Sequence, residues 1–201
     1  MKGNIIMNKV IDFYFDYGSP ATYLAWTQIY KIVEEADANL NMIPMLLGGV
    51  FKETGNASPA TVPAKSKWMG ADLRMYAKNY NVEFNSNSFF PINTLNLMRG
   101  AIAAQKLDIF EKYSDTIFKG IWVKDLNLGD LEVLKDYLEK SGIPSDEVFK
   151  LCQDQEIKNE LITNTQEAVS KGIFGAPSFI IDGILIFGQD RLHFVKDLLT
   201  N

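Results

Sequence analysis

The sequence is nearly without the residues that carry redox and metal chemistry. Its 201 residues include one cysteine, Cys152, and one histidine, His193. A single cysteine cannot form a disulfide within the chain, and these two residues leave no Cys/His cluster of the kind that holds zinc. Disulfide exchange within one chain and metal chemistry are therefore excluded.

These two rare residues are themselves poor candidates for catalysis. Cys152 ends a stretch with helical spacing, residues 148–152, and we expect it to pack in the core as a small apolar side chain. His193 lies in the C-terminal segment without a second His, Ser or Cys in a recognisable arrangement, so a packing or surface position is expected.

Long apolar runs and an excess of basic residues are also lacking. No segment approaches the roughly 20 apolar residues of a membrane span, and residues 1–8 have neither the apolar run nor the cleavage site of a signal peptide. The net charge of −5 gives no basic surface for a nucleic acid backbone. The protein is therefore expected to be cytoplasmic, with neither a membrane nor a nucleic acid as a partner.

What the sequence does have is enough apolar surface for a folded core, beginning with a β-α-β pattern. At 47% hydrophobic residues the chain can form one or two domains. Alternation predicts a strand over residues 10–15, helical spacing predicts a helix over 20–35, and a second strand follows over 40–47. For such a unit a parallel, right-handed crossover is the default. Residues 48–59 are rich in Gly, Asn and Pro, which predicts a loop without regular structure over most of its length.

The rest of the chain consists of a helical block, a hairpin and one more helix. Helices are predicted near residues 64–80, 94–105, 109–120, 128–141, 145–152 and 157–171. Strand patterns at 178–181 and 184–187 flank Asp182-Gly183, which predicts a hairpin, and a last helix follows over 190–199. This order predicts an α/β fold in which residues 8–50 and 172–201 form a thioredoxin-like domain and residues 51–171 form an all-helical insertion.

The junction at Ser19-Pro20 is the most informative local feature. A hydroxyl at the N-cap and a proline at the first helical position put Ser19 beside unpaired N–H groups. Their positive field favours a bound anion, including a thiolate. In a thioredoxin-like fold Pro177 is expected to be cis and to face Ser19. The plainer alternative is that Ser19 only caps the helix.

Several segments, in order along nearly the whole chain, resemble one family. Residues 12–25, 51–59, 62–65, 90–94, 172–179 and 187–192 are similar to the 2-hydroxychromene-2-carboxylate isomerases. These enzymes belong with the kappa-class glutathione transferases in the DsbA-like branch of the thioredoxin fold. The resemblance therefore agrees with the fold that the element order predicts.

The resemblance implies a glutathione site in which Ser19 is catalytic and holds the sulfur as a thiolate. Ala176, before Pro177, pairs its backbone with the cysteinyl part, while Asp190 and Arg191 hold the glutamyl end. The implied glutathione-binding set is Ser19, Asn56, Ala176, Pro177, Phe187, Gly188, Gln189, Asp190 and Arg191. The substrate-binding candidates are Lys52, Thr61, Val62 and Lys65. Each assignment has a structural alternative: a helix cap for Asp190, a scaffold role for Pro177, a turn for Asn56 and a surface charge for Arg191.

The sequence also departs from patterns in the wider family. Ser19-Pro20-Ala21-Thr22 stands where DsbA-like oxidoreductases have Cys-Pro-x-Cys, so thiol-disulfide exchange has no nucleophile. Some naphthalene-pathway isomerases carry a basic substrate-contacting residue about where this chain has Phe51, and Lys52 and Lys65 are the candidates to replace it.

The activity that the resemblance implies is a glutathione-dependent isomerisation of a small aromatic acid. In this family the thiolate adds to a conjugated alkene, a bond rotates, and the thiolate leaves again. Two alternatives stay open: a kappa-like transferase that conjugates electrophiles, and a thioredoxin-fold protein that binds glutathione or a peptide without catalysis. The sequence does not decide the oligomeric state, and a homodimer is one option.

Overall fold

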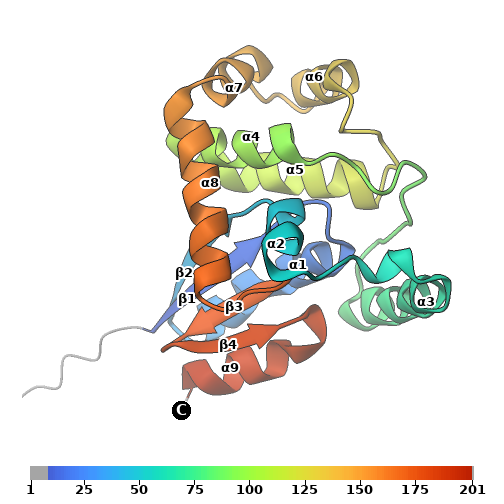
Figure 1. Ribbon diagram of the computed structural model, residues 1–201, viewed down its shortest axis with the longest axis vertical. Helices are drawn as coiled ribbons and strands as arrows, with labels where there is room; N and C mark the ends of the chain where they lie inside the picture. The colour runs from blue at the N-terminus through green and yellow to red at the C-terminus, as the bar shows by residue number, and fades with distance from the viewer. Residues whose placement is uncertain (1–8, 201) are drawn as a thin grey trace, which may run out of the picture.

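The computed structural model describes residues 9–200, and within them a four-stranded sheet forms the centre of the molecule (Figure 1). The strands are β1 (Val10–Phe15), β2 (Asn39–Pro44), β3 (Ser178–Ile181) and β4 (Ile184–Phe187), in the order β2-β1-β3-β4. β2 runs parallel to β1, whereas β3 is antiparallel to both β1 and β4. Asp182 and Gly183 both have positive φ, as a two-residue hairpin turn requires. The predicted β-α-β unit and hairpin are confirmed.

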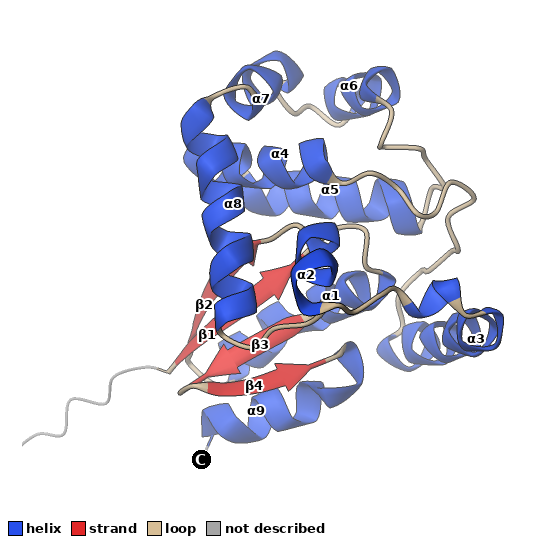
Figure 2. Cartoon of the chain, in the orientation of Figure 1, coloured by secondary structure: helices blue, strands red, loops and turns tan. Residues whose placement is uncertain are grey.

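Alternation along β1 sends its side chains into two cores. Ile11, Phe13 and Phe15 are fully buried in the main core, together with side chains of α1 (Pro20–Glu35) and α9 (Leu192–Thr200). Tyr14 points to the other face, where it joins a smaller buried cluster with Val50 and side chains of the C-terminal half of the chain. Helices therefore cover both faces of the sheet (Figure 2).

The helical block predicted between residues 64 and 171 is present, with ends that shift by a few residues. Its members are α3 (Pro63–Tyr80), α4 (Leu95–Lys106), α5 (Phe110–Trp122), α6 (Leu131–Lys140), α7 (Ser145–Cys152) and α8 (Gln155–Ser170). Helices α4 to α7 gather beyond one end of the sheet, and α8 leads from them back along the sheet (Figure 1). The predicted thioredoxin-like sheet with a large helical insertion is confirmed.

The prediction that residues 48–59 lack regular structure is wrong. Helix α2 (Leu47–Thr54) and the short 3-10 turn η1 (Pro59–Thr61) lie there. Glycine lowers helix propensity, but Gly49 allows α2 to approach α8, because a Cβ at this position would lie 3.0 Å from Cγ2 of Thr165. Val50 is fully buried on the same helix. Packing therefore outweighs the composition of the segment.

Two further boundaries differ from the prediction. The second strand ends at Pro44 rather than at residue 47, because proline has no N–H for the ladder and α2 begins three residues later. The last helix has two parts, a 3-10 turn η2 (Gln189–Arg191) followed by α9.

The division of the chain into two domains stays a prediction. Residue 8 lies outside the described residues, as do residues 1–7, in which the sequence predicts no signal peptide. Helix α2 runs across the predicted boundary between residues 50 and 51. Between residues 9 and 200, no helix is both long and apolar enough to cross a membrane.

Candidate active site

Ser19 caps the N-terminus of α1, as the Ser-Pro pair predicts. Its Oγ accepts a hydrogen bond from the N–H of Thr22 at 3.1 Å, and Pro20 takes the first helical position. Ser19 is 5% exposed. The hydroxyl thus lies at the positive end of a 16-residue helix with little competing water, where a negative charge is stabilised.

The Ser19 hydroxyl also contacts the loop that precedes β3. It donates to the carbonyl oxygen of Ala176 at 2.9 Å, and the Ala176-Pro177 peptide bond is cis, as predicted. The carbonyl of Pro177 in turn accepts the N–H of Gly188 at 3.0 Å. One short loop therefore connects Ser19 with the beginning of η2.

Asn56 reaches the same loop from α2. It follows Gly55, which ends α2 with a φ of +70°, and its Nδ2 donates to the carbonyl of Phe174 at 2.7 Å. Its Oδ1 also accepts the N–H of Ala57, so the predicted turn role is present as well. Asn56 and Ser19 thus bind carbonyl groups of the same loop, at residues 174 and 176.

Asp190 and Arg191 form an ion pair on η2. Arg191 Nη1 lies 3.1 Å from both carboxylate oxygens of Asp190 and 3.1 Å from the carbonyl of Phe187. Their side chains are 38% and 49% exposed, so both charges remain open to a ligand. Within residues 9–200 the Asp190 carboxylate accepts its hydrogen bonds from Arg191, and the alternative role of Asp190 as a cap of the last helix stays a prediction.

Three residues of α3 that are not among the predicted site residues border this ion pair. Tyr80 donates its hydroxyl hydrogen to the carbonyl of Gln189 at 2.7 Å. Burial, with smaller contributions from Tyr76 and Asp190, raises the pKa of Tyr80 to about 12. Burial and then the charge of Asp190 also raise the pKa of Asp72. Asp72, Tyr76 and Tyr80 are spaced by four residues, so their shared helix face was visible in the sequence.

A fully buried carboxylate, Asp16, lies behind the site. Its oxygens accept the N–H of Gly18 at 2.8 Å, the N–H of Leu47 at 2.8 Å and the hydroxyl of Thr94 at 3.1 Å. Desolvation raises its pKa, and the three hydrogen bonds oppose that shift. Because its own carbonyl accepts the N–H of Ser19, Asp16 connects the Ser19 loop with the first residue of α2 and with the N-cap residue of α4.

Thr22 takes the position of the second cysteine in a Cys-Pro-x-Cys sequence. It is fully buried, and its Oγ1 has no hydrogen-bond partner within the described part of the chain. With Ser19 and Thr22 at these positions, the helix terminus presents hydroxyl groups where an oxidoreductase has thiols.

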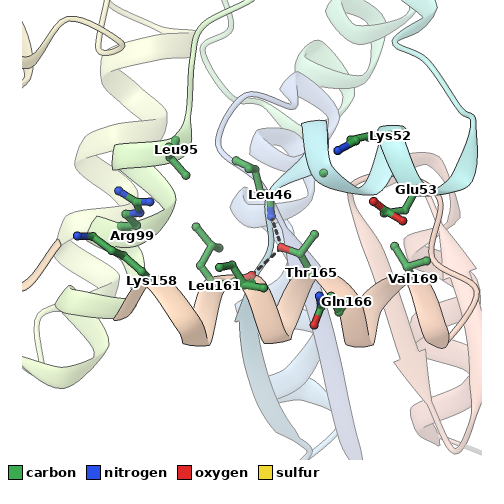
Figure 3. A pocket seen from close by; sticks show the side chains of 12 residues that line it. Leu46, Lys52, Glu53, Leu95, Arg99, Lys158, Leu161, Thr165, Gln166 and Val169 are labelled. Carbon is green, nitrogen blue, oxygen red and sulfur yellow. Dashed lines mark hydrogen bonds between the residues drawn. The ribbon is translucent and has the colours of Figure 1, made fainter. Parts of the chain in front are cut away.

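The four substrate-binding candidates do not form one cluster. Thr61 and Val62 are exposed at η1 and at the N-cap of α3, and Lys65 is exposed in the first turn of that helix. Lys52 instead lines a cavity between α2, α4 and α8, together with Arg99 and Lys158 (Figure 3). Their roles stay predictions.

Cys152 and His193 lie where the sequence predicts. Cys152 is 3% exposed, and burial raises the pKa of its thiol to about 11, so the thiol stays protonated near neutral pH. His193 is exposed on α9, with its ring against that of Phe194. Among residues 9–200 there is no group of three or more His, Cys, Asp and Glu side chains that could hold a metal ion.

Comparisons with known proteins agree with the fold. The family model described as DSBA-like thioredoxin domain matches residues 10–200. A 2-hydroxychromene-2-carboxylate isomerase from Sphingobium xenophagum is 28% identical over 97% of this chain and 100% of its own length. A glutathione S-transferase kappa 2 from Caenorhabditis elegans is 30% identical over 96% of this chain and 92% of its own length.

A solved structure gives the same result for the fold. The selenomethionine form of 2-hydroxychromene-2-carboxylate isomerase superimposes with a TM-score of 0.83 at 22% identity, over 94% of this chain and 93% of that one. The chain belongs to the DsbA-like thioredoxin family and, within it, is similar to the 2-hydroxychromene-2-carboxylate isomerases and the kappa-class glutathione transferases.

Proposed function

We propose that this protein is a glutathione-dependent isomerase of the 2-hydroxychromene-2-carboxylate type. The observation that carries the proposal is the contact between Ser19, at the N-terminus of α1, and Ala176, before the cis-proline. The family relatives are isomerases and glutathione transferases, which supports enzymatic activity. Glutathione would supply a thiolate nucleophile.

Ser19 is suited to stabilise that thiolate. Its Oγ accepts from the N–H of Thr22, so the serine keeps its place at the cap while its hydroxyl hydrogen turns from Ala176 toward a ligand. A hydroxyl donor and a helix N-terminus both favour an anion and lower the pKa of a thiol bound there. The carbonyl of Ala176, once free, accepts a donor from the ligand backbone.

Asp190 and Arg191 fit the other end of glutathione. The glutamyl group carries an ammonium and a carboxylate on one carbon, and this ion pair offers a carboxylate and a guanidinium side by side. Both side chains are partly exposed, so each can exchange part of its contact with the other for a contact with the ligand. These features support glutathione rather than a thiol without a charged end.

A carboxylate on the substrate requires a cation near the site. Of the two lysines that the sequence offers, Lys65 is exposed in the first turn of α3. Lys52 lines the cavity between α2, α4 and α8. We therefore assign the substrate carboxylate to Lys65.

A kappa-like transferase is the second candidate, because the 30% identical relative carries that name. It would use the same thiolate and differ in that the product keeps the sulfur. The third alternative, binding without catalysis, requires no turnover of either substrate.

Two assays with glutathione distinguish these activities. The purified protein is incubated with 2-hydroxychromene-2-carboxylate and, separately, with chlorodinitrobenzene, while free thiol is measured over time. The proposal expects conversion of the chromene acid at constant glutathione. Consumption of glutathione with chlorodinitrobenzene and no conversion of the acid would favour the transferase, and inactivity in both assays would contradict enzymatic function.

A further inference from the structure

One cavity of the molecule is lined by residues other than those of the proposed glutathione site. It has a volume of about 380 Å³ and is formed by α2, α4 and α8 (Figure 3). Its lining includes none of Ser19, Asn56, Ala176, Pro177 and the residues of η2. Cavities that bind small organic molecules start at about 300 Å³, so the space suits a small ligand.

The walls of this cavity are largely apolar. They are formed by the side chains of Leu46, Leu95, Leu161, Ile162 and Val169. The hydroxyl of Thr165, also in the wall, is already used: it accepts the N–H of Leu46 at 2.9 Å and donates to the carbonyl of Leu161 at 2.7 Å. The wall therefore favours a ligand with an apolar body.

Three cations surround this apolar space. Lys52 comes from α2, Arg99 from α4 and Lys158 from α8, whereas Glu53 is the one acidic residue in the lining. Within residues 9–200, none of the three cations has an ion pair or a side-chain hydrogen bond, although other lysines of this region do, such as Lys106 with Glu156. The Nε atom of Arg99 is buried without a partner. A buried donor in this state is costly to leave unpaired. Because Nε itself is covered while the Arg99 side chain as a whole is half-buried, an anion in the cavity pairs with this donor when the guanidinium turns toward it.

We propose that the cavity lined by Arg99 and Lys158 is a second binding site, which takes an organic monocarboxylate with an apolar body. The carboxylate meets Arg99 and Lys158, and the body lies against the leucine side chains between α4 and α8. An inorganic anion would leave the apolar wall without contacts, and an uncharged apolar molecule would leave Arg99 unpaired. The apolar wall and the two cations together therefore favour a ligand that has both an apolar body and a carboxylate.

Octanoate is a suitable probe, and calorimetric titration of the full chain measures its binding. We expect one site per chain with a dissociation constant of about 1 mM or lower. Arg99→Gln should weaken binding roughly tenfold, as the loss of one charge-assisted hydrogen bond does. Lys158→Gln, which changes a half-buried residue, should act in the same direction and serves if Arg99→Gln does not fold. Lys150→Gln, on the exposed side of α7, is the matched control and should bind as the wild type does.

Two further titrations test the charge requirement, and one competition experiment tests the location. Octyltrimethylammonium should not bind, octanol should bind more weakly than octanoate, and saturating glutathione should leave the octanoate affinity unchanged. The proposal is overturned by no octanoate binding, by equal binding in wild type, Arg99→Gln and Lys158→Gln, by octanol binding as tightly as octanoate, or by displacement of octanoate with glutathione. None of these measurements depends on turnover, so they are independent of the proposed activity.

Discussion

The hydroxyl of Ser19 donates to the carbonyl oxygen of Ala176 at 2.9 Å and thereby joins two segments 157 residues apart in the chain. One belongs to the first β-α-β unit and the other precedes the C-terminal hairpin. Neither segment alone forms a site. Their contact brings together a hydroxyl, a helix N-terminus and the carbonyl of the residue before a cis-proline, and the first prediction follows from it.

Ser19→Ala should lower turnover far more than stability. The variant loses the cap on Thr22 and the contact with Ala176, and loss of a cap lowers the free energy of unfolding by about 0.5–2 kcal/mol. Turnover should fall on the order of a hundredfold, the typical effect of removing one donor to a reacting anion. The ultraviolet absorbance of bound thiolate, followed against pH, should show a higher thiol pKa in the variant.

Asp130→Ala provides a matched control for that experiment. Asp130 caps α6 by accepting the N–H groups of Glu132 and Val133, so the hydrogen bonds of its side chain stay within the first turn of that helix. Its loss should reduce stability to a similar extent without changing turnover. Identical thiolate titrations in wild type and Ser19→Ala would refute the assigned role of Ser19.

The local patterns and the family resemblance together predicted the sheet, the helical block and the cap at Ser19. These features depend on signals within one segment, such as alternation in β1 or a Ser-Pro pair, which act wherever the segment lies. Helix α2 was not predicted because it is stabilised by contacts with residues far away in the sequence. Gly49 packs against Thr165 of α8, and the N–H of Leu47 binds Asp16, contacts that composition cannot reveal.

The same limit applies to the site. The resemblance named the residues that would hold glutathione. In the structure, Ser19, Asn56 and Gly188 each donate a hydrogen bond to a carbonyl of the loop that precedes β3. Asp16 stood within the quoted motif but was not singled out, since its burial among donors from three segments is a tertiary property. Tyr80 was missed although its spacing on α3 was readable, because nothing in the sequence indicated that α3 packs on η2.

Asp190→Ala should mainly raise the glutathione concentration needed for the half-maximal rate. Loss of a charge-assisted hydrogen bond, about 1.5–3 kcal/mol, corresponds to roughly ten- to hundredfold weaker binding. Saturating glutathione should restore most of the wild-type rate, because an interaction made equally in the ground and transition states affects affinity alone. Glutathione titrations at fixed substrate measure both quantities.

Lys196→Gln is the control for this change, since Lys196 lies on α9, the helix that follows η2, and forms an exposed ion pair with Glu35 of α1. Its half-saturation value should equal that of the wild type. If folded Asp190→Ala also keeps the wild-type value, the glutamyl end of glutathione does not bind at η2.

Because of Asp16, the free energy of unfolding should fall as the pH rises above about 4. Its pKa is raised from the usual 3.8 by burial, so the folded chain holds this proton to a higher pH than the unfolded chain does. The stabilisation linked to this proton is therefore complete below the unfolded pKa and is lost as pH rises through the folded pKa. The free energy of unfolding of the wild type, compared with that of Asp16→Asn in urea titrations, should decline over this window.

Asp125→Asn tests the sign of that argument. Hydrogen bonds from Ser88 lower the pKa of Asp125, so its contribution should be present above the unfolded pKa and be lost as pH falls. The two variants should thus give opposite slopes relative to the wild type. A pH-independent difference between the wild type and Asp16→Asn would mean that Asp16 has the same pKa in the folded and unfolded chains.

Gly188→Ala should weaken glutathione binding through Asp190. Gly188 has a φ of +99°, and a Cβ at this position would meet the Asp190 carboxylate, which must then move away from Arg191. Gly183 provides the comparison, because its φ of +80° imposes similar backbone strain but nothing lies within 4 Å of the added Cβ. Both variants should lose stability, on the order of 1 kcal/mol, in urea unfolding. Only Gly188→Ala should also raise the half-saturation value for glutathione, and an equal value in the two variants would show that the position of the Asp190 carboxylate does not determine binding.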